Sequence, residues 1–140
     1  MNKTSTWLSG IACLFLATSA SAQSGPLSVE LNKFEPGVPS GCQAYFLFRN
    51  DTGKSFEGFE MSLAILDAQG VIDRLLSIDA APLPVQRTTL KLFAIPDIDC
   101  SDISEIVLHD MPACQPQNED EVDCFEFLEL GSKTDAQLVK

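Results

Sequence analysis

Residues 59–78 read FEMSLAILDAQGVIDRLLSI and show the clearest strand pattern of the chain. Large apolar side chains take every second position of the first half of this stretch: Phe59, Met61, Leu63 and Ile65. This two-residue period is that of a β-strand with one buried face. A turn follows at 67–70 with glycine at its end, where a positive φ is needed, and a second apolar-rich run covers 71–78. The stretch predicts a β-hairpin with Ile65 in the core.

The rest of the chain shows the same short period, and no helical stripe competes with it. Turn-rich segments containing Gly, Pro, Asn and Asp separate the runs. Further strands are predicted at 27–32, 45–48, 88–95, 103–108 and 124–130. The run 45–48 is apolar on both faces, which fits either a strand covered on each side or one near a sandwich edge. We predict an all-β, immunoglobulin-like antiparallel β-sandwich of about seven strands, with a fraying tail at 133–140.

Residues 1–22 have the pattern of a cleaved signal peptide. Lys3 precedes an uncharged apolar run at 8–17, and Ala20-Ser21-Ala22 supplies the small-x-small pattern that signal peptidase reads. The apolar run is shorter than the ~20 residues of a membrane-spanning helix. We expect cleavage before Gln23 and a single β-sandwich domain at 23–140, periplasmic or secreted, with no membrane contact after cleavage.

The predicted mature chain is strongly acidic. Loss of the leader removes Lys3 and no acid, so the whole-chain balance of 9 basic and 20 acidic residues becomes 8 and 20, a net charge of −12. Such a surface repels nucleic acid and anionic lipid. Nucleic-acid partners are therefore not expected, and the bias serves solubility.

Four cysteines remain after the leader: Cys42, Cys100, Cys114 and Cys124. An oxidising compartment favours structural disulfides over thiolate chemistry. Four cysteines allow three connectivities. We favour Cys42 with Cys100, because both sit just before predicted strands. Cys114 and Cys124 then close a local loop around the acidic run 119–123.

Few residues offer catalysis or metal binding. His109 is the one histidine, and its neighbour Asp110 should point to the opposite face of a strand. No catalytic residue and no cofactor are predicted. His109 and Met111, two residues apart, are weak candidates for a copper-type metal site, to which only Met61 could be added. The acidic run 119–123 lacks the glycine and spacing of a calcium-binding loop, so we predict a solvated loop.

Three segments carry a resemblance to a known family. They are CQAYFLFRNDTG at 42–53, LDAQGVI at 66–72 and IVLHD at 106–110 ahead of Cys114. Together they resemble a family of small uncharacterised exported proteins of Gram-negative bacteria, some labelled as Tat pathway signal proteins. The resemblance implies export, although this leader lacks the Arg-Arg pair of that pathway.

Three classes of function follow. The leading one is a non-catalytic binding or interaction module that contacts another exported protein through an edge strand or the loops at one end of the sandwich. The alternatives are a periplasmic metal-binding protein using His109 and Met111, and an enzyme of unknown class.

Overall fold

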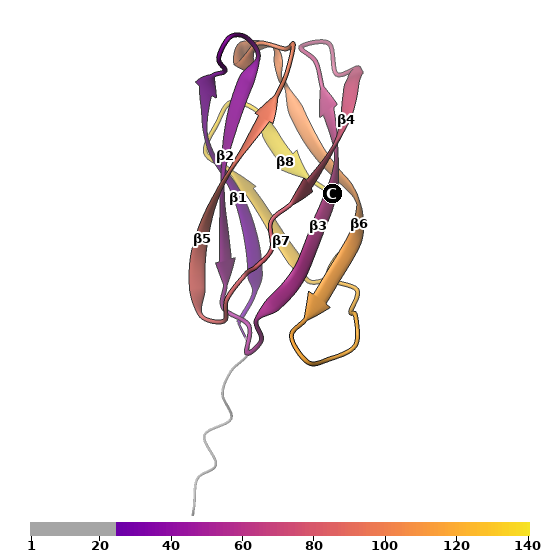
Figure 1. The fold of residues 1–140 in the computed structure, drawn as a ribbon. Helices are drawn as coiled ribbons and strands as arrows, with labels where there is room; N and C mark the ends of the chain where they lie inside the picture. Colours follow the sequence, from indigo (N-terminus) through magenta and orange to yellow (C-terminus); the bar gives the residue numbers. More distant parts are fainter. Residues whose placement is uncertain (1–24) are drawn as a thin grey trace, which may run out of the picture.

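The structure is a computed structural model that describes residues 25–140. The predicted signal peptide, 1–22, and its cleavage before Gln23 lie outside the described residues. Figure 1 shows two facing sheets, with β5, β2 and β1 on the left and β4, β3 and β6 on the right. Within residues 25–140, no helix has the length and hydrophobicity to span a membrane.

Two four-stranded sheets form the sandwich. One has the order β5-β2-β1-β7 and the other β4-β3-β6-β8. The strands are β1 (Leu27–Pro36), β2 (Cys42–Asn50), β3 (Phe56–Leu66), β4 (Ile72–Asp79), β5 (Arg87–Ile95), β6 (Glu105–Pro116), β7 (Leu128–Ser132) and β8 (Gln137–Val139). A short 3₁₀ turn, η1 (Cys100–Asp102), lies between β5 and β6. The orders β5-β2-β1 and β4-β3-β6 match the two sheets of an immunoglobulin-like sandwich.

The strand count of seven is wrong, because the tail forms an eighth strand. Gln137–Val139 adds to β6 as a parallel strand, and β7 likewise pairs with β1 in parallel. The sheets are therefore mixed, with the parallel pairs on one side. A three-residue strand carries too little pattern to be recognised in sequence, and its stability comes from its neighbours.

Several predicted strands also differ in extent. β1 continues to Pro36 instead of residue 32, and β2 covers Cys42–Asn50 instead of 45–48. The segment before β6 is taken by η1, and β6 then continues to Pro116, well beyond residue 108. Residues 124–127 form a turn, in which the Leu128 N–H donates to the Cys124 carbonyl at 3.0 Å. The last predicted strand therefore begins at Leu128 instead of Cys124.

The central hairpin is confirmed. β3 and β4 pair antiparallel, and Gly70 closes the turn with a φ of +76°. The Asp67 carboxylate accepts from the N–H groups of Gln69 and Val71 at 2.9 and 3.0 Å, which fixes the turn. Ile65 is fully buried, as predicted. The phenylalanine pairs Phe48–Phe59 and Phe56–Phe59 meet edge to face in the core.

One buried polar side chain ties the connections at one end of the sandwich together. Asn50, which is 1% exposed, donates from Nδ2 to the carbonyls of Lys54, Leu83 and Pro84 at 2.8 to 3.2 Å. Its Oδ1 accepts from the Thr52 hydroxyl at 2.6 Å. The β2–β3 loop is thereby fixed to the β4–β5 connection.

The two sides of the sandwich differ. β7 and β8 pack against each other and close one side. β4 and β5 end their sheets on the other side, so each has an outer edge with no strand paired to it among the described residues. This open side positions the candidate site.

Candidate interaction surface

An apolar patch covers the outer face of β2 and β5. We call this patch the β2–β5 face and define it by Tyr45, Leu47, Leu90 and Leu92. Leu90 lies opposite Leu47 and Leu92 opposite Tyr45 in the strand register. Leu90 is 53% exposed and Leu92 is 44% exposed. Leu90 and Leu92 thus form a pair of exposed apolar side chains on the outer face of β5.

The sequence accounts for this patch, because β2 is apolar on both of its faces. Ala44, Phe46 and Phe48 point into the core and are buried. Tyr45 and Leu47 alternate with them and so lie on the outer face. β2 lies beside an edge strand, which is the second of the two arrangements that an apolar 45–48 allows.

The charge on these two strands differs from the rest of the chain. β2 and β5 hold Arg49, Arg87 and Lys91 and no aspartate or glutamate, whereas the whole chain has 20 acidic residues. Arg49 and Arg87 are exposed. Arg49 lies on this outer face, whereas Lys91 and Arg87 lie opposite the buried Phe46 and Asn50. The acids Glu30 and Glu35 of β1 adjoin Leu47 and Tyr45, so the positive charge is confined to the two strands themselves.

Lys33 and Glu35 of β1 border the face at Tyr45. The Lys33 ammonium lies 2.5 Å from the Glu35 carboxylate and 4.9 Å from the centre of the Tyr45 ring. The Tyr45 hydroxyl donates to Glu35 at 2.5 Å. The hydrogen bond from Lys33, followed by that from Tyr45, lowers the pKa of Glu35, and the bonds to Glu35 raise the pKa of Lys33 and of Tyr45. Tyr45 is thereby held in position beside Leu92.

His109 lies on the outer face of the other sheet, in a bulge of β6. Ser62 pairs with Asp110 while Leu63 pairs with Leu108, so His109 is an extra residue. For this reason His109 and Asp110 are both exposed, and the expectation that they point to opposite faces is wrong. The Ser62 hydroxyl lies 2.8 Å from His109 Nε2. The Asp110 carboxylate accepts from the Met111 N–H at 2.9 Å, so it is engaged with the backbone.

Met111 is packed against the core. His109, Asp110 and Met111 line a shallow depression of about 270 Å³ with Asp123 and Phe125. No cluster of three or more His, Cys, Asp or Glu side chains in residues 25–140 is arranged to hold a metal ion. The two predicted metal candidates therefore lie near each other without a further ligand cluster around them.

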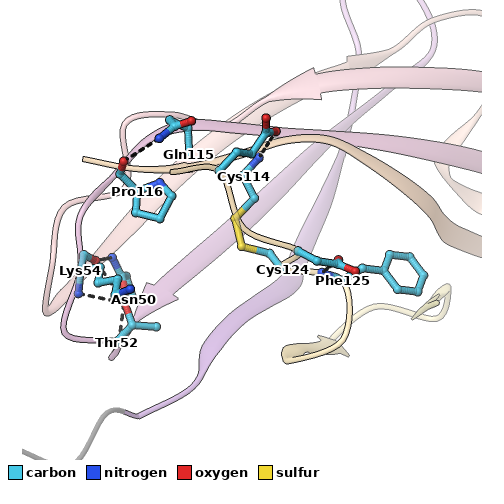
Figure 2. Close-up of a disulfide and its surroundings, with 10 residues drawn as sticks. Asn50, Thr52, Lys54, Cys114, Gln115, Pro116, Cys124 and Phe125 are labelled. Atoms are coloured by element: carbon cyan, nitrogen blue, oxygen red, sulfur yellow. Dashed lines mark hydrogen bonds between the residues drawn. A yellow bond between two sulfur atoms is a disulfide. The ribbon is translucent and has the colours of Figure 1, made fainter. Parts of the chain in front are cut away.

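The acidic run 119–123 lies in the loop between β6 and β7 that the second disulfide closes (Figure 2). Lys54 forms a 2.6 Å ion pair with Glu119, and the Gln115 amide donates to the Glu119 carbonyl. The Glu121 carboxylate accepts from the Cys114 N–H at 3.4 Å. Two of these acids are thus used to fold the loop.

Both favoured disulfides are present. Cys42 is bonded to Cys100 with a Cα–Cα distance of 4.9 Å, and Cys114 to Cys124 with 6.0 Å. The first joins the start of β2 to η1 just after β5, and the second fixes the acidic loop to the end of β6. The four sulfurs are therefore structural.

Further hollows are present in the described part of the chain. One of about 640 Å³ lies at the end where β1 begins, with Phe56, Val122 and Phe127 among its lining residues. Another of about 450 Å³ is lined by five aspartates: Asp67, Asp73, Asp97, Asp99 and Asp102.

Sequence reasoning missed three functional or positioning residues. Ser62 was one polar member of an alternating strand, and its contact with His109 depends on the β3–β6 register. The polar sequence NDTG at 50–53 is typical of a turn, whereas Asn50 ends β2 and is buried. Lys91 lay within a predicted strand, and only the sheet order shows that this strand is an edge. A lysine between two leucines was the available signal for Lys91.

Comparison of the chain with protein-family models, with curated proteins and with solved structures finds no match.

Proposed function

We propose that this protein is an exported, non-catalytic interaction module that contacts another exported protein through the β2–β5 face. The observation that carries the proposal is the pair of exposed leucines, Leu90 and Leu92, on a strand whose outer edge is unpaired among residues 25–140. Exposed apolar area beside open backbone hydrogen-bonding groups is the usual basis of recognition at a sheet edge.

Export to the periplasm or beyond belongs to the same proposal. Two disulfides are typical of proteins that fold in an oxidising compartment. The leader pattern and the resemblance to small exported proteins of Gram-negative bacteria support the same location. A partner would then be met in that compartment.

Site-specific cross-linking in the cells that produce the protein tests this function. A photoreactive amino acid replaces Leu90 in one variant and Leu75 in the other. Leu75 is the matched control, because it is a 63% exposed leucine on the outer face of the other edge strand, β4. We expect an adduct with a second exported protein from position 90 and none from position 75.

The same experiment can reject the proposal. An adduct at both positions would indicate a generally sticky surface, and no adduct at position 90 would remove the β2–β5 face as the contact site. An adduct only between two copies of the chain would replace the partner by self-association.

A further inference from the structure

The edge of β5 is unusually regular for an exposed edge. Nine consecutive pairs join β2 and β5, from Cys42 with Ile95 to Asn50 with Arg87, without a register shift. The pairs β1–β2, β3–β4 and β3–β6 each contain at least one shift. β5 also contains no proline. Natural edges are commonly blunted by bulges and prolines, so β5 retains a geometry that another strand can extend.

Lys91 gives this edge its selectivity. It lies opposite Phe46 and therefore on the inward-facing side of β5. The side chain is half-buried, and its ammonium donates to the Ala81 carbonyl at 3.3 Å, in the connection from β4. An inward-facing lysine on an edge opposes the addition of a purely apolar strand. A strand with a carboxylate opposite Lys91 gains an ion pair instead.

The same lysine opposes pairing between two copies of this chain. Two β5 strands aligned about Lys91 would set one ammonium directly opposite the other, and like charges in a cross-strand pair are destabilising. Arg87 adds a further positive charge to the edge, which contains no acid to offset it. The edge therefore favours a different, acidic segment.

The flanking residues define the rest of the segment. Leu90 and Leu92 lie on either side of Lys91 and point to the outer face. Residues opposite them in an added strand would extend the apolar patch if they were apolar. The complementary sequence is thus apolar, acidic, apolar at three successive positions.

We infer that β5 binds an extended segment of another exported protein as an added strand, with an apolar-acidic-apolar triplet whose carboxylate pairs with Lys91. This inference rests on the proposed function, because it specifies the partner segment at the same surface. Backbone hydrogen bonds along the edge would supply affinity, and Lys91 with its two leucine neighbours would supply specificity.

The test uses the purified protein and two synthetic peptides. One is Thr-Val-Thr-Val-Glu-Val-Thr-Val-Thr, matched to the nine residues of β5, and the other has Lys in place of Glu. We expect the Glu peptide to bind about tenfold more tightly, since the central pair changes from attraction to repulsion. On binding, amide exchange should slow in β5 and stay unchanged in β4.

Charge-reversal variants decide between specific and general electrostatic attraction. Lys91→Glu should reverse the preference between the two peptides. Arg74→Glu is the matched control, because Arg74 is the inward-facing basic residue of β4, opposite the buried Ile65. It should leave the preference as it is. The milder Lys91→Gln, which removes the charge with little change in shape, should equalise the two peptides even if Lys91→Glu folds poorly.

The outcomes separate the inference from the function on which it rests. Cross-linking from Leu90 to a partner, together with no binding or no discrimination between peptides, would overturn strand addition and leave the interaction module standing. Equal loss of preference in Arg74→Glu would overturn the role of Lys91. Failure of both experiments would reject both proposals.

Discussion

The two edge strands on the open side, β4 and β5, are similar in exposure and opposite in character. Leu75 on β4 is 63% exposed and Leu90 on β5 is 53% exposed. β4 carries acids at Asp73 and Asp79, and its pairing with β3 is interrupted between Ile65 and Leu66. β5 has no acid and no interruption. The two edges therefore differ in charge and in the regularity of their pairing, although their exposure is similar.

Inward-facing basic residues are the feature that the two edges share. Arg74 on β4 lies 2.6 Å from the carboxylate of its neighbour Asp73, so its charge is partnered on the same strand. Lys91 on β5 has a backbone carbonyl and no carboxylate as its contact in the described part of the chain. The difference leaves β5 with a charge that a ligand can neutralise.

The largest expected effect concerns the disulfide that joins the start of β2 to η1, next to the end of β5. Cys42–Cys100 closes a separation of 58 residues, and Cys42 pairs with Ile95 at the end of β5. Replacing both cysteines with alanine should cost about 4 kcal/mol in the free energy of unfolding. The control pair, Cys114 and Cys124, closes only 10 residues and should cost about 3 kcal/mol. Chemical denaturation measures both, and the reverse order would contradict this assignment.

The second-largest loss of stability is expected from truncation of Ile65, in the core behind β4. Ile65 is fully buried and lies opposite Arg74. Ile65→Ala should lower the free energy of unfolding by about 3 kcal/mol, within the 2 to 5 kcal/mol known for such truncations. Leu75→Ala, on the exposed face of β4, should change it by less than about 0.5 kcal/mol. An unchanged denaturation midpoint for Ile65→Ala would mean that the face assignment is wrong.

Replacing Asn50 should affect the start of β5 and leave β4 unchanged. Asn50 pairs with Arg87, the first residue of β5, and donates to the Leu83 and Pro84 carbonyls just before it. Asn50→Ala should cost about 2 kcal/mol, because buried carbonyls lose their donor. Amide exchange should accelerate near Arg87 and remain unchanged in β4. The exposed Asn32→Ala is the control, and a loss of similar size there would contradict the role of Asn50.

A smaller effect depends on pH. The contacts with Lys33 and Tyr45 lower the pKa of Glu35 below its ordinary value of 4.5. Its stabilising contribution is then present above pH 4.5 and lost as the pH falls through the lowered pKa. Glu35→Gln should therefore be slightly less stable than the natural chain at pH 7, and the difference should vanish in acid. A difference that persists at low pH would point to packing instead of charge.

Copper titration should show the smallest effect. A tight copper site would mean that the sheet containing β4 also binds a ligand. His109 and Met111 lie on that sheet without a cluster of three His, Cys, Asp or Glu ligands in residues 25–140. Calorimetry should find the same weak copper binding in the natural chain and in the His109→Ala, Met111→Ala double variant. Tight binding of one equivalent that disappears in the double variant would establish a metal site there.

The sequence predicts the sandwich well wherever the apolar alternation of a single strand shows which of its faces is buried. The alternation from Phe59 to Ile65 and the glycine at position 70 specify the hairpin without reference to other strands. The disulfide pairing was also predicted, because turn-rich segments flank each cysteine. The eighth strand was missed, because Gln137–Val139 is defined by β6 and not by its own pattern.

The candidate surface could be predicted only in part. The two-sided apolar character of residues 45–48 left open whether the strand is covered on each side or lies near a sandwich edge, and only the sheet order decides between the two. The sequence does not show that β5 is an edge strand, so it could not indicate a binding role for Leu90, Lys91 and Leu92. The bulge at His109 could not be predicted either, since a single inserted residue has no signature apart from its partner strand.

The parallel pairing of β1 with β7 has a kinetic consequence. Leu27 pairs with Leu128, near the opposite end of the described chain. Contacts between residues so far apart require closure of a long loop before they stabilise the chain, and folds dominated by them reach the native state in milliseconds to seconds. We therefore expect refolding of this sandwich to be slow for its size, with β7 and β8 joining last.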